Sequence, residues 1–299
     1  RCNEDCPIVN TPMRQLTELF PDLSITVVGI IRNDKGILPN SNDRMLPGDD
    51  VYFVCDANHV SRAMAAFGHE EEEGRTVIIA GGGNIGLTLA EEIEQEHEGV
   101  RSRLIEFDDK RARAVAQQLE QTMVLNGDVL DLEILEEAHV GNTETFVAVS
   151  NDDEVNIIGS LLAKRAGAKR TIALINKHSY GQLITTLGID AVVNPRVITV
   201  SSILQHVRRG RIRGIYSVRE DFGEVIEAEA LETSVLVNRS LKESKLPKGV
   251  IVGAIVRDEE VIAPRGGTVI GKNDSVILFS TYESIKQVEK MFSVRVDFF

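Results

Sequence analysis

TVIIAGGGNIG, residues 76–86, is the stretch around which the rest of the chain is organised. It begins with the apolar run Val77–Ala80, which has the length and composition of a buried strand. Gly81, Gly83 and Gly86 then fit the spacing G-x-G-x-x-G, and apolar residues recur beyond them at helical intervals. The glycines therefore fall at a strand-to-helix turn, which is the context that a dinucleotide-binding fingerprint requires.

Each glycine of this turn has its own expected role. Gly81 permits the tight turn, Gly83 lets the backbone approach a pyrophosphate, and Gly86 lets the helix lie close to the strand. The N-terminus of the helix offers unpaired N–H groups and a partial positive charge to the phosphates. The alternative is that this segment is only a tight strand-to-helix connection without a ligand.

An acidic residue follows at the end of the next expected strand, Arg103–Phe107. Glu106 lies 20 residues after Gly86, where a carboxylate accepts hydrogen bonds from an adenosine ribose. A carboxylate there repels a 2′-phosphate, which favours NAD or a plain adenine nucleotide over NADP. The alternative reading makes Glu106 a solvated strand end.

The composition of the 299-residue chain is that of a folded, water-soluble protein. Hydrophobic residues make up 42% and charged residues 26% of it. A formal net charge of −13 argues against a nucleic-acid partner or an anionic membrane surface. The sequence has no apolar run near the ~18 residues of a membrane span, so we expect no direct membrane insertion.

Between residues 75 and 195, six short apolar runs alternate with five helical patterns. This alternation predicts an α/β fold with a Rossmann-like, doubly wound parallel sheet. The runs are Val77–Ala80, Arg103–Phe107, Met123–Leu125, Thr145–Ser150, Thr171–Ile175 and Ala191–Val193, and the helices lie near Ile85–Gln95, Lys110–Leu119, Asp131–Ala138, Glu154–Ala166 and Ser179–Leu187.

Ligands bind such sheets beyond the carboxyl ends of the strands. That rule selects a set of candidate cofactor-binding residues and, after the fifth strand, Asn176 and Lys177. The set is Gly81, Gly82, Gly83, Asn84, Ile85, Gly86, Glu106, Gly127, Asp128, Ser150 and Asn151.

A further helix is expected at Val197–Val207. Val197, Val200, Leu204 and Val207 form one stripe, whereas Ile198 and Ile203 lie off it. Apolar residues this widely spread need burial on more than one side, which predicts a homo-oligomer covered by a second copy. The short basic run that follows, Arg208, Arg209, Arg211 and Arg213, is interpreted as a solvated helix end.

The two ends of the chain repeat one another. An offset of 225 residues maps Arg32 to Arg257 and Asp49 to Asp274, and ITVVGIIR pairs with VIVGAIVR. Two small α+β domains, at residues 1–68 and 214–299, therefore flank the Rossmann domain at 75–213, which includes the helix after the sheet. Glu70–Glu73 is expected to be a linker. The repeat predicts that residues 7–68 are the tail of a preceding unit, whose nucleotide domain would lie upstream of Arg1.

Other chemical motifs are weak. Cys2 and Cys6 could bind a metal or pair with each other. Two ligands make no closed zinc site, so we expect free thiols near a loose chain end and no metal site. Tyr282 and Lys286 match the Y-x-x-x-K of short-chain dehydrogenases, but they fall in the last helix of the second repeat. We interpret them as ordinary helix residues, so that no catalytic residue is assigned.

Five motifs together resemble the family of domains that regulates potassium conductance. They are IIAGGGNIG at 78–86, LIEFDDKRA at 104–112, LNGDVLD at 125–131, AVSNDDEVN at 148–156 and the paired blocks PGDDVYFV and KNDSVILF. The resemblance covers essentially the whole chain, with tandem units of which the first nucleotide domain is absent. By position, it implies that Gly81–Gly86 holds phosphates, Glu106 the ribose, and Asp128 with its neighbours the adenine edge.

The resemblance also implies a function. The expected protein is a cytoplasmic regulatory subunit, peripheral at the inner face of the membrane, that binds NAD or another adenine nucleotide such as ATP or ADP. It would form homo-oligomers and gate a membrane potassium-translocating subunit, without being an enzyme. The alternative function is an NAD-dependent oxidoreductase, which would need an acid/base group beside the nicotinamide.

Overall fold

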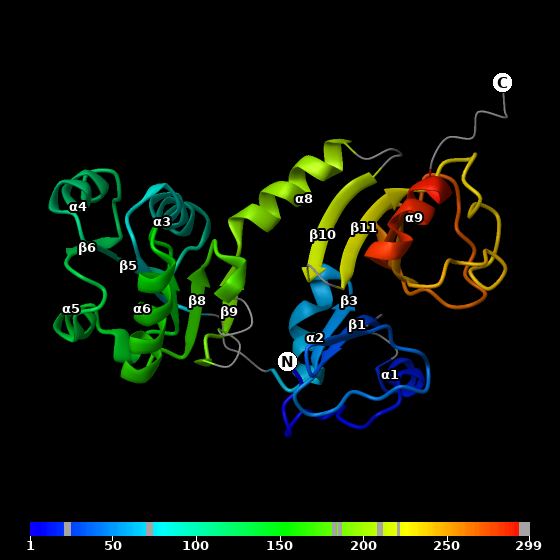
Figure 1. Ribbon diagram of the computed structural model, residues 1–299, viewed down its shortest axis with the longest axis horizontal. Helices are drawn as coiled ribbons and strands as arrows, with labels where there is room; N and C mark the ends of the chain where they lie inside the picture. Colours follow the sequence, from blue (N-terminus) through cyan, green and yellow to red (C-terminus); the bar gives the residue numbers. More distant parts are fainter. Residues whose placement is uncertain are drawn as a thin grey trace. The chain divides into compact units, whose positions relative to one another are not determined.

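The computed structural model describes residues 1–20, 25–69, 74–180, 184, 187–207, 212–219 and 222–292 (Figure 1). The chain divides into two compact units. One comprises residues 72–196, and the other combines residues 1–71 with residues 197–299. The expected linker Glu70–Glu73, Arg208, Arg209 and Arg211 of the basic run, and most of the expected helix Ser179–Leu187 lie outside the described residues.

A six-stranded parallel sheet forms the centre of the unit at 72–196. Its strand order is β6-β5-β4-β7-β8-β9, so the chain starts in the middle, winds to one edge and then returns to wind to the other. This order confirms the Rossmann-like, doubly wound sheet. The strands are β4 (Thr76–Ala80), β5 (Arg101–Glu106), β6 (Met123–Asn126), β7 (Thr145–Ala148), β8 (Arg170–Leu174) and β9 (Ala191–Val193).

Helices cover both faces of this sheet (Figure 1). Ala90 and Val115 pack on one face beside Ile79, and Leu135 and Ala163 pack on the other beside residues such as Phe146. The strands are apolar on both sides because both faces are covered. The helices are α3 (Asn84–Glu96) and α4 (Asp109–Ala116) on the first face, and α5 (Leu132–Glu137) and α6 (Asp153–Ala166) on the second.

The other unit holds two small domains built on antiparallel sheets. The sheet order is β2-β1-β3 in the first domain and β10-β11-β14-β12-β13 in the second. The strands are β1 (Thr26–Arg32), β2 (Lys35–Ile37), β3 (Asp50–Val54), β10 (Ile212–Arg219), β11 (Gly223–Glu229), β12 (Val250–Arg257), β13 (Glu260–Ile262) and β14 (Ser275–Thr281); the helices are α1 (Met13–Leu19), α2 (Val60–Ala66) and α9 (Ile285–Phe292).

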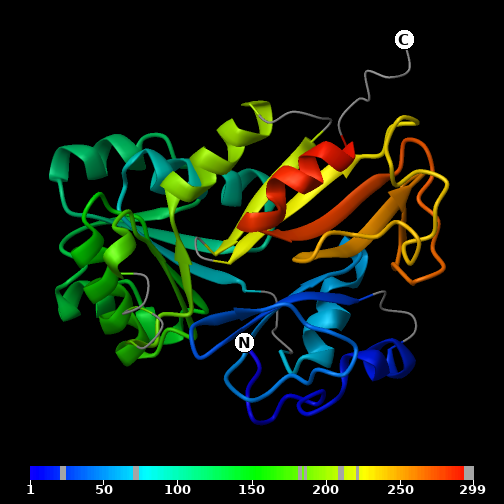
Figure 2. The same ribbon diagram turned by 45° about the vertical axis from the view of Figure 1, so that its right-hand side comes forward.

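The two small domains share an apolar core. Val28 and Ile31 of β1 pack against Phe222 and Phe279 of the second domain. Figure 2 shows the blue strands of the first domain beneath the yellow and orange strands of the second. Gly253 allows this approach, because a Cβ atom there would lie 2.6 Å from a methyl group of Val54.

Two features of the first domain differ from expectation. Helix α1 was not anticipated, because its seven residues are too few to show a clear helical period. The start of the chain is not loose: Cys2 and Cys6 are free thiols, but their exposed fractions are 0% and 5%, within the core of the domain. Burial raises the pKa of Cys2 to about 12, with further contributions from Cys6.

The expected helix after the sheet is α8 (Pro195–Val207). Leu204 packs against the core of the second small domain. Ile198, Val200 and Ile203 remain exposed by 59%, 53% and 56%. None of the helices among the described residues has the length and apolarity to span a membrane.

Candidate nucleotide-binding site

The glycine turn lies where the winding of the sheet reverses, between β4 and β7. Ala80, the last residue of β4, pairs with Ile105 of β5 on one side and with Ala148 of β7 on the other. Glu106 pairs with Asn126 one strand further along. The chain segments that leave β4, β5, β6 and β7 therefore emerge at one edge, which is where open α/β sheets bind ligands.

The geometry of the turn fits the role expected of each glycine. Gly81 has a φ of +113°, which favours glycine, and its Cβ atom would lie 2.9 Å from the Ser150 nitrogen. A Cβ atom on Gly86 would lie 1.9 Å from the Gly81 carbonyl oxygen, so helix and turn can touch only through glycine. At Gly83 the added Cβ atom meets nothing within 4 Å, so its backbone borders open space.

Helix α3 differs at its N-terminus from α4, α5 and α6. Asp108, Asp131 and Asp152 cap α4, α5 and α6, each through a hydrogen bond from a backbone N–H to its carboxylate. Gly83 occupies the same position in α3, where no side chain caps the helix. The N-terminal N–H groups of α3 are thus left for an external acceptor, and an anion suits them best.

Glu106 lies at the edge of this turn. Its Oε2 accepts a hydrogen bond from the Gly82 N–H at 2.6 Å, and its Oε1 accepts one from the Asp108 N–H at 2.9 Å. Both bonds orient the carboxylate. Each carboxylate oxygen can accept more than one hydrogen bond, so the group can still bind the hydroxyls of a ribose.

The remaining predicted residues occupy the same edge in different ways. Gly127 follows β6, and a Cβ atom there would lie 2.4 Å from a carbon of Ile134, so its smallness serves packing. Asp128 accepts a hydrogen bond from the Leu130 N–H at 2.9 Å. Ser150, after β7, is half-buried and hydrogen-bonded within the protein, whereas Asn151 is exposed.

The residue that holds Ser150 was not predicted from the sequence. Asn156, which is 1% exposed, accepts hydrogen bonds from Ser150 N at 2.9 Å and from Ser150 Oγ at 2.7 Å. Its amide nitrogen donates to the carbonyl oxygens of Ser150 and Leu174 at 2.9 and 2.8 Å. One side chain thereby fixes the loops after β7 and β8. A polar residue on the buried face of α6 was the available signal.

The loop after β8 is attached to α6 as well. Asp153, 4% exposed, accepts hydrogen bonds from the Asn176 and Lys177 N–H groups at 3.0 and 2.8 Å. Burial alone raises the pKa of this carboxyl group, but those N–H groups outweigh burial and hold the pKa below its usual value. The Lys177 ammonium lies 2.7 Å from Glu154 Oε1, which also accepts from Tyr180 at 2.6 Å.

Tyr282 and Lys286 belong to the other unit. Tyr282 begins a 3₁₀ turn, Tyr282–Ser284, and Lys286 follows in α9, so the expected single helix was wrong in that detail. The Tyr282 hydroxyl donates to the Arg219 carbonyl oxygen at 3.2 Å. This tyrosine is therefore engaged within its own small domain.

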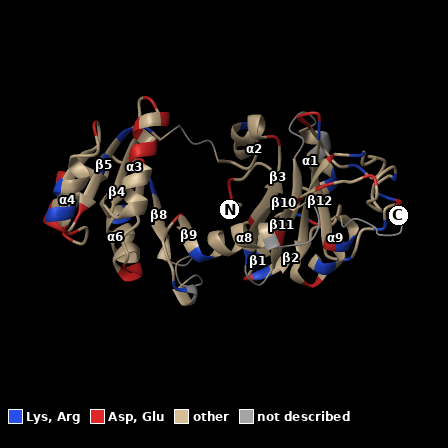
Figure 3. Ribbon diagram, turned by 90° about the horizontal axis from the view of Figure 1, so that it is seen from above, with Lys and Arg blue, Asp and Glu red and all other residues tan. Residues whose placement is uncertain are grey.

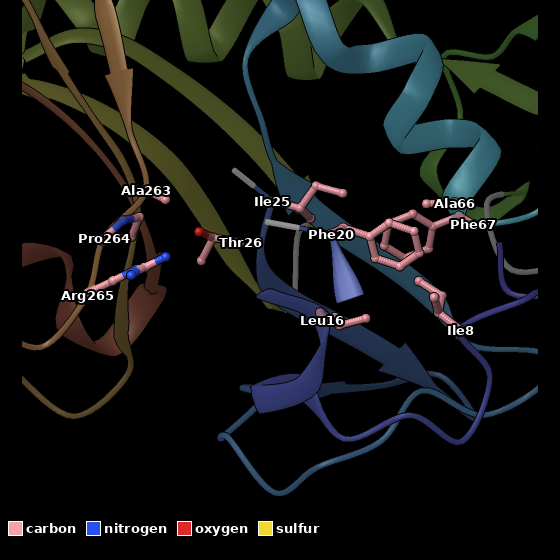
Figure 4. Close-up of a pocket in the computed structure, with 10 residues that line it drawn as sticks. All are labelled: Ile8, Leu16, Phe20, Ile25, Thr26, Ala66, Phe67, Ala263, Pro264 and Arg265. Atoms are coloured by element: carbon pink, nitrogen blue, oxygen red, sulfur yellow. The ribbon is translucent and has the colours of Figure 1, made fainter. Parts of the chain in front are cut away.

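The unit of small domains contains a cavity of about 80 Å³, shown in Figure 4. Leu16, Phe20 and Phe67 line it from the first domain, and Pro264 and Arg265 from the second. Water occupies about 30 Å³ per molecule in the liquid, so this volume holds only a few waters. It is too small for an adenine nucleotide.

Two known domain families match the chain. Residues 77–195 match the TrkA-N domain, and residues 1–68 and 225–293 match the TrkA-C domain. The chain belongs to the TrkA family. The two small domains match the same domain type, which accounts for the repeat in the sequence.

Curated relatives carry the name Trk system potassium uptake protein TrkA. The chain is 50% identical over 298 residues to that of Azorhizobium caulinodans, covering 100% of this chain and 65% of the relative. It is 37% identical to that of Vibrio alginolyticus, covering 96% of this chain and 63% of the relative, and 34% identical to that of Haemophilus influenzae, covering 95% and 62%. The chain thus spans less than two thirds of these relatives.

Solved structures similar to this TrkA-family chain include the GsuK RCK domain, with a TM-score of 0.48 and 16% identity over 96% of this chain and 61% of that one. The GsuK channel bound to NAD has a TM-score of 0.49 and 16% identity, covering 96% of this chain and 50% of that one.

Proposed function

We propose that this chain is the nucleotide-binding regulatory part of a potassium-uptake system and that an adenine nucleotide binds at Gly81–Gly86. The observation that carries the proposal is the N-terminus of α3, left without a side-chain cap beside Gly83. A pyrophosphate placed there accepts hydrogen bonds from the helix and gains from its dipole. Glu106 would hold the ribose, and Gly127, Asp128, Ser150 and Asn151 border the same edge.

The charges at this edge favour NAD, ATP or ADP over NADP. Both oxygens of Glu106 are anchored by backbone N–H groups, so the carboxylate cannot swing away from an incoming 2′-phosphate. A like charge held in place would repel that phosphate. NADP⁺ should accordingly bind more weakly than NAD⁺.

The proposed partner is a membrane potassium-translocating protein, contacted from the cytoplasmic side. The names of the relatives support this assignment. A bound nucleotide would contact several of the loops that follow the strands. Because ligands of different length would contact different loops, they would favour different arrangements of the protein. A ligand shifts such an equilibrium only through its differential affinity for the two states.

The proposed assembly is a homo-oligomer that covers part of α8. Val200 and Ile203 lie three residues apart on one exposed face of this helix, and Ile198 adds further apolar surface. Leaving a large apolar side chain in water costs about 1.5–3 kcal/mol relative to burying it fully. A second copy of the chain is the proposed cover.

The alternative function, an NAD-dependent oxidoreductase, has weaker support. Tyr282 of the Y-x-x-x-K motif lies in a small domain, where it bonds to Ser217 and Arg219. Lys177 follows β8 at the ends of the strands, but its ammonium pairs with Glu154. Side-chain bonding to Lys177 and Tyr180 lowers the pKa of Glu154 to about 2, which makes it a poor proton donor near neutral pH.

The test combines binding and flux. Calorimetry of the full chain with NAD⁺, NADH, ATP and ADP should give saturable binding of at least one of them. Glu106→Ala should weaken binding and, in vesicles with the membrane subunit, reduce the nucleotide response of potassium flux in parallel. Glu106→Gln is the conservative variant: its one amide oxygen can replace only one of the two acceptors that the Gly82 and Asp108 N–H groups use, so it should weaken binding less than Glu106→Ala does. A normal flux response with binding lost would show that this site is not the switch.

A further inference from the structure

Two side chains hold the peptide groups of the glycine turn from opposite ends of Gly82. The Gly82 N–H donates to Glu106 Oε2 at 2.6 Å. The Gly82 carbonyl oxygen accepts a hydrogen bond from Arg111 Nε, also at 2.6 Å. Gly82 is buried and Arg111 half-buried, so both bonds are shielded from water.

The bond from Arg111 determines where the next N–H points. The Gly82 carbonyl and the Gly83 N–H belong to one planar peptide group, and in the trans form they point in opposite directions. Fixing the carbonyl toward Arg111 therefore fixes the Gly83 N–H away from it. Because neither residue has a Cβ atom, little else resists a flip of this peptide group.

A flip at this position would matter for an anion. Gly83 is the residue that precedes the first turn of α3, and the space beside it is open. With the Gly82 carbonyl bonded to Arg111, the Gly83 N–H points away from Arg111 and is available to an anion at the uncapped end of the helix. After a flip, a carbonyl oxygen would take its place and repel a phosphate.

Arg111 is itself held in register with Glu106. Its backbone N–H donates to the Asp108 carboxylate at 2.8 Å, and the Asp108 N–H donates to Glu106 Oε1 at 2.9 Å. The acid at the end of β5 and the base on α4 thus form one hydrogen-bonded frame around Gly82. The sequence EFDDKR supplies the whole frame within six residues.

We propose that Arg111 is a positioning residue of the phosphate-binding turn, which keeps the Gly83 N–H directed toward a bound phosphate. The inference rests on the proposed function and assigns the phosphate preference of that site to a residue outside the glycine motif. It predicts that replacing Arg111 lowers the affinity for nucleotides and leaves the affinity for adenosine unchanged.

The test is a series of ligands that differ in phosphate content. Adenosine, AMP, ADP and NAD⁺ are titrated into the full chain and its variants. Arg111→Met should weaken the binding of ADP about tenfold, the effect typical of losing a hydrogen bond from a charged donor, and leave the affinity for adenosine nearly unchanged. Arg111→Lys should recover part of the loss, because an ammonium can donate to the same carbonyl.

Arg113→Met is the matched control. Arg113 lies on the same helix, where basic and acidic residues stand side by side (Figure 3), and pairs with Asp109 one turn away. Its side chain is 77% exposed. This variant should bind all four ligands like the unmodified chain. In spectra with ¹⁵N-labelled glycine, the Gly83 amide signal should move in Arg111→Met and stay in place in Arg113→Met.

The outcomes separate the two proposals. If the unmodified chain binds none of the ligands, the proposed function fails. If it binds ADP and Arg111→Met binds ADP equally well, only the role of Arg111 is wrong. An equal loss for adenosine and ADP overturns that role too, and so does a loss for ADP without any change in the Gly83 signal.

Discussion

Arg257 donates two parallel hydrogen bonds to Asp274, from Nε to Oδ1 at 2.8 Å and from Nη2 to Oδ2 at 2.7 Å. The side chain of Asp274 is only 2% exposed. Asp274 also accepts from the Gly271 N–H at 2.7 Å. Arg32 and Asp49 make the same pair of bonds in the first small domain, at 2.8 and 2.7 Å. The repeat in the sequence is therefore a repeat of one ion pair with a buried carboxylate. It ties the end of β1 to the turn before β3 in the first small domain, and the end of β12 to the turn before β14 in the second.

Replacing Asp274 should destabilise the second small domain. Asp274→Asn removes the charge that Arg257 faces and should lower the free energy of unfolding by about 2 kcal/mol, the worth of hydrogen bonds to a charged group. The hydrogen bonds from Arg257 hold the pKa of Asp274 below its usual value. This stabilisation is then complete above the unfolded pKa of about 4 and is lost as the pH falls through the lower folded value.

Urea unfolding at a series of pH values checks this prediction. The difference between the unmodified chain and Asp274→Asn should be largest near pH 7 and shrink below about pH 4. Lys272→Met is the control, since Lys272 pairs with Glu232 between side chains that are 57% and 73% exposed. A difference that stays constant down to pH 2 would contradict the assignment.

Two glycines of the turn should respond in opposite ways to substitution. Gly86→Ala places a methyl group 1.9 Å from the Gly81 oxygen, and such overlap costs about 1–3 kcal/mol against roughly 1 kcal/mol gained in helix propensity. At Gly83 the Cβ atom of a new side chain meets nothing within 4 Å. We expect Gly86→Ala to lower the melting temperature, and Gly83→Val to keep it while nucleotide affinity falls. Unchanged affinity in Gly83→Val would remove Gly83 from the site.

The chain should not turn over NADH with carbonyl substrates. Tyr282 is bonded to Ser217 and Arg219 within its small domain, and the structure places it in a different unit from the glycine turn. The measurement is the absorbance of NADH with a panel of aldehydes and ketones. A steady fall that disappears in Tyr282→Phe would revive the oxidoreductase function.

Association through α8 should depend on its exposed apolar face. Ile203→Asp would bury a charge in the proposed interface and should dissociate the oligomer, as seen by light scattering. Leu204 is unsuitable, because it packs against the core of the second small domain. A monomeric unmodified chain at about 10 μM would count against the interface, since stable oligomers have micromolar or tighter affinity.

Much of the Rossmann unit follows from local patterns. Val77–Ala80 could be recognised as a strand because a fully covered parallel strand is a short unbroken apolar run. The connection Gly81–Gly86 could be recognised because its glycines meet steric demands visible in their spacing. Helix α1 could not be recognised in the same way. It has only seven residues, and Leu16 is the one buried side chain among those described, which is too few to show a helical periodicity.

The sequence by itself determined the alternation of six strands with helices, the repeat and the edge at which the candidate site lies, since these depend on periodicity and on spacing along the chain. Tertiary structure alone decided what holds that site in shape. Arg111 reaches Gly82 across 29 residues, and Asn156 joins Ser150 to the end of β8. The burial of Cys2 and Cys6 was decided in the same way. Such contacts depend on the direction of side chains in three dimensions, which no one-dimensional pattern specifies.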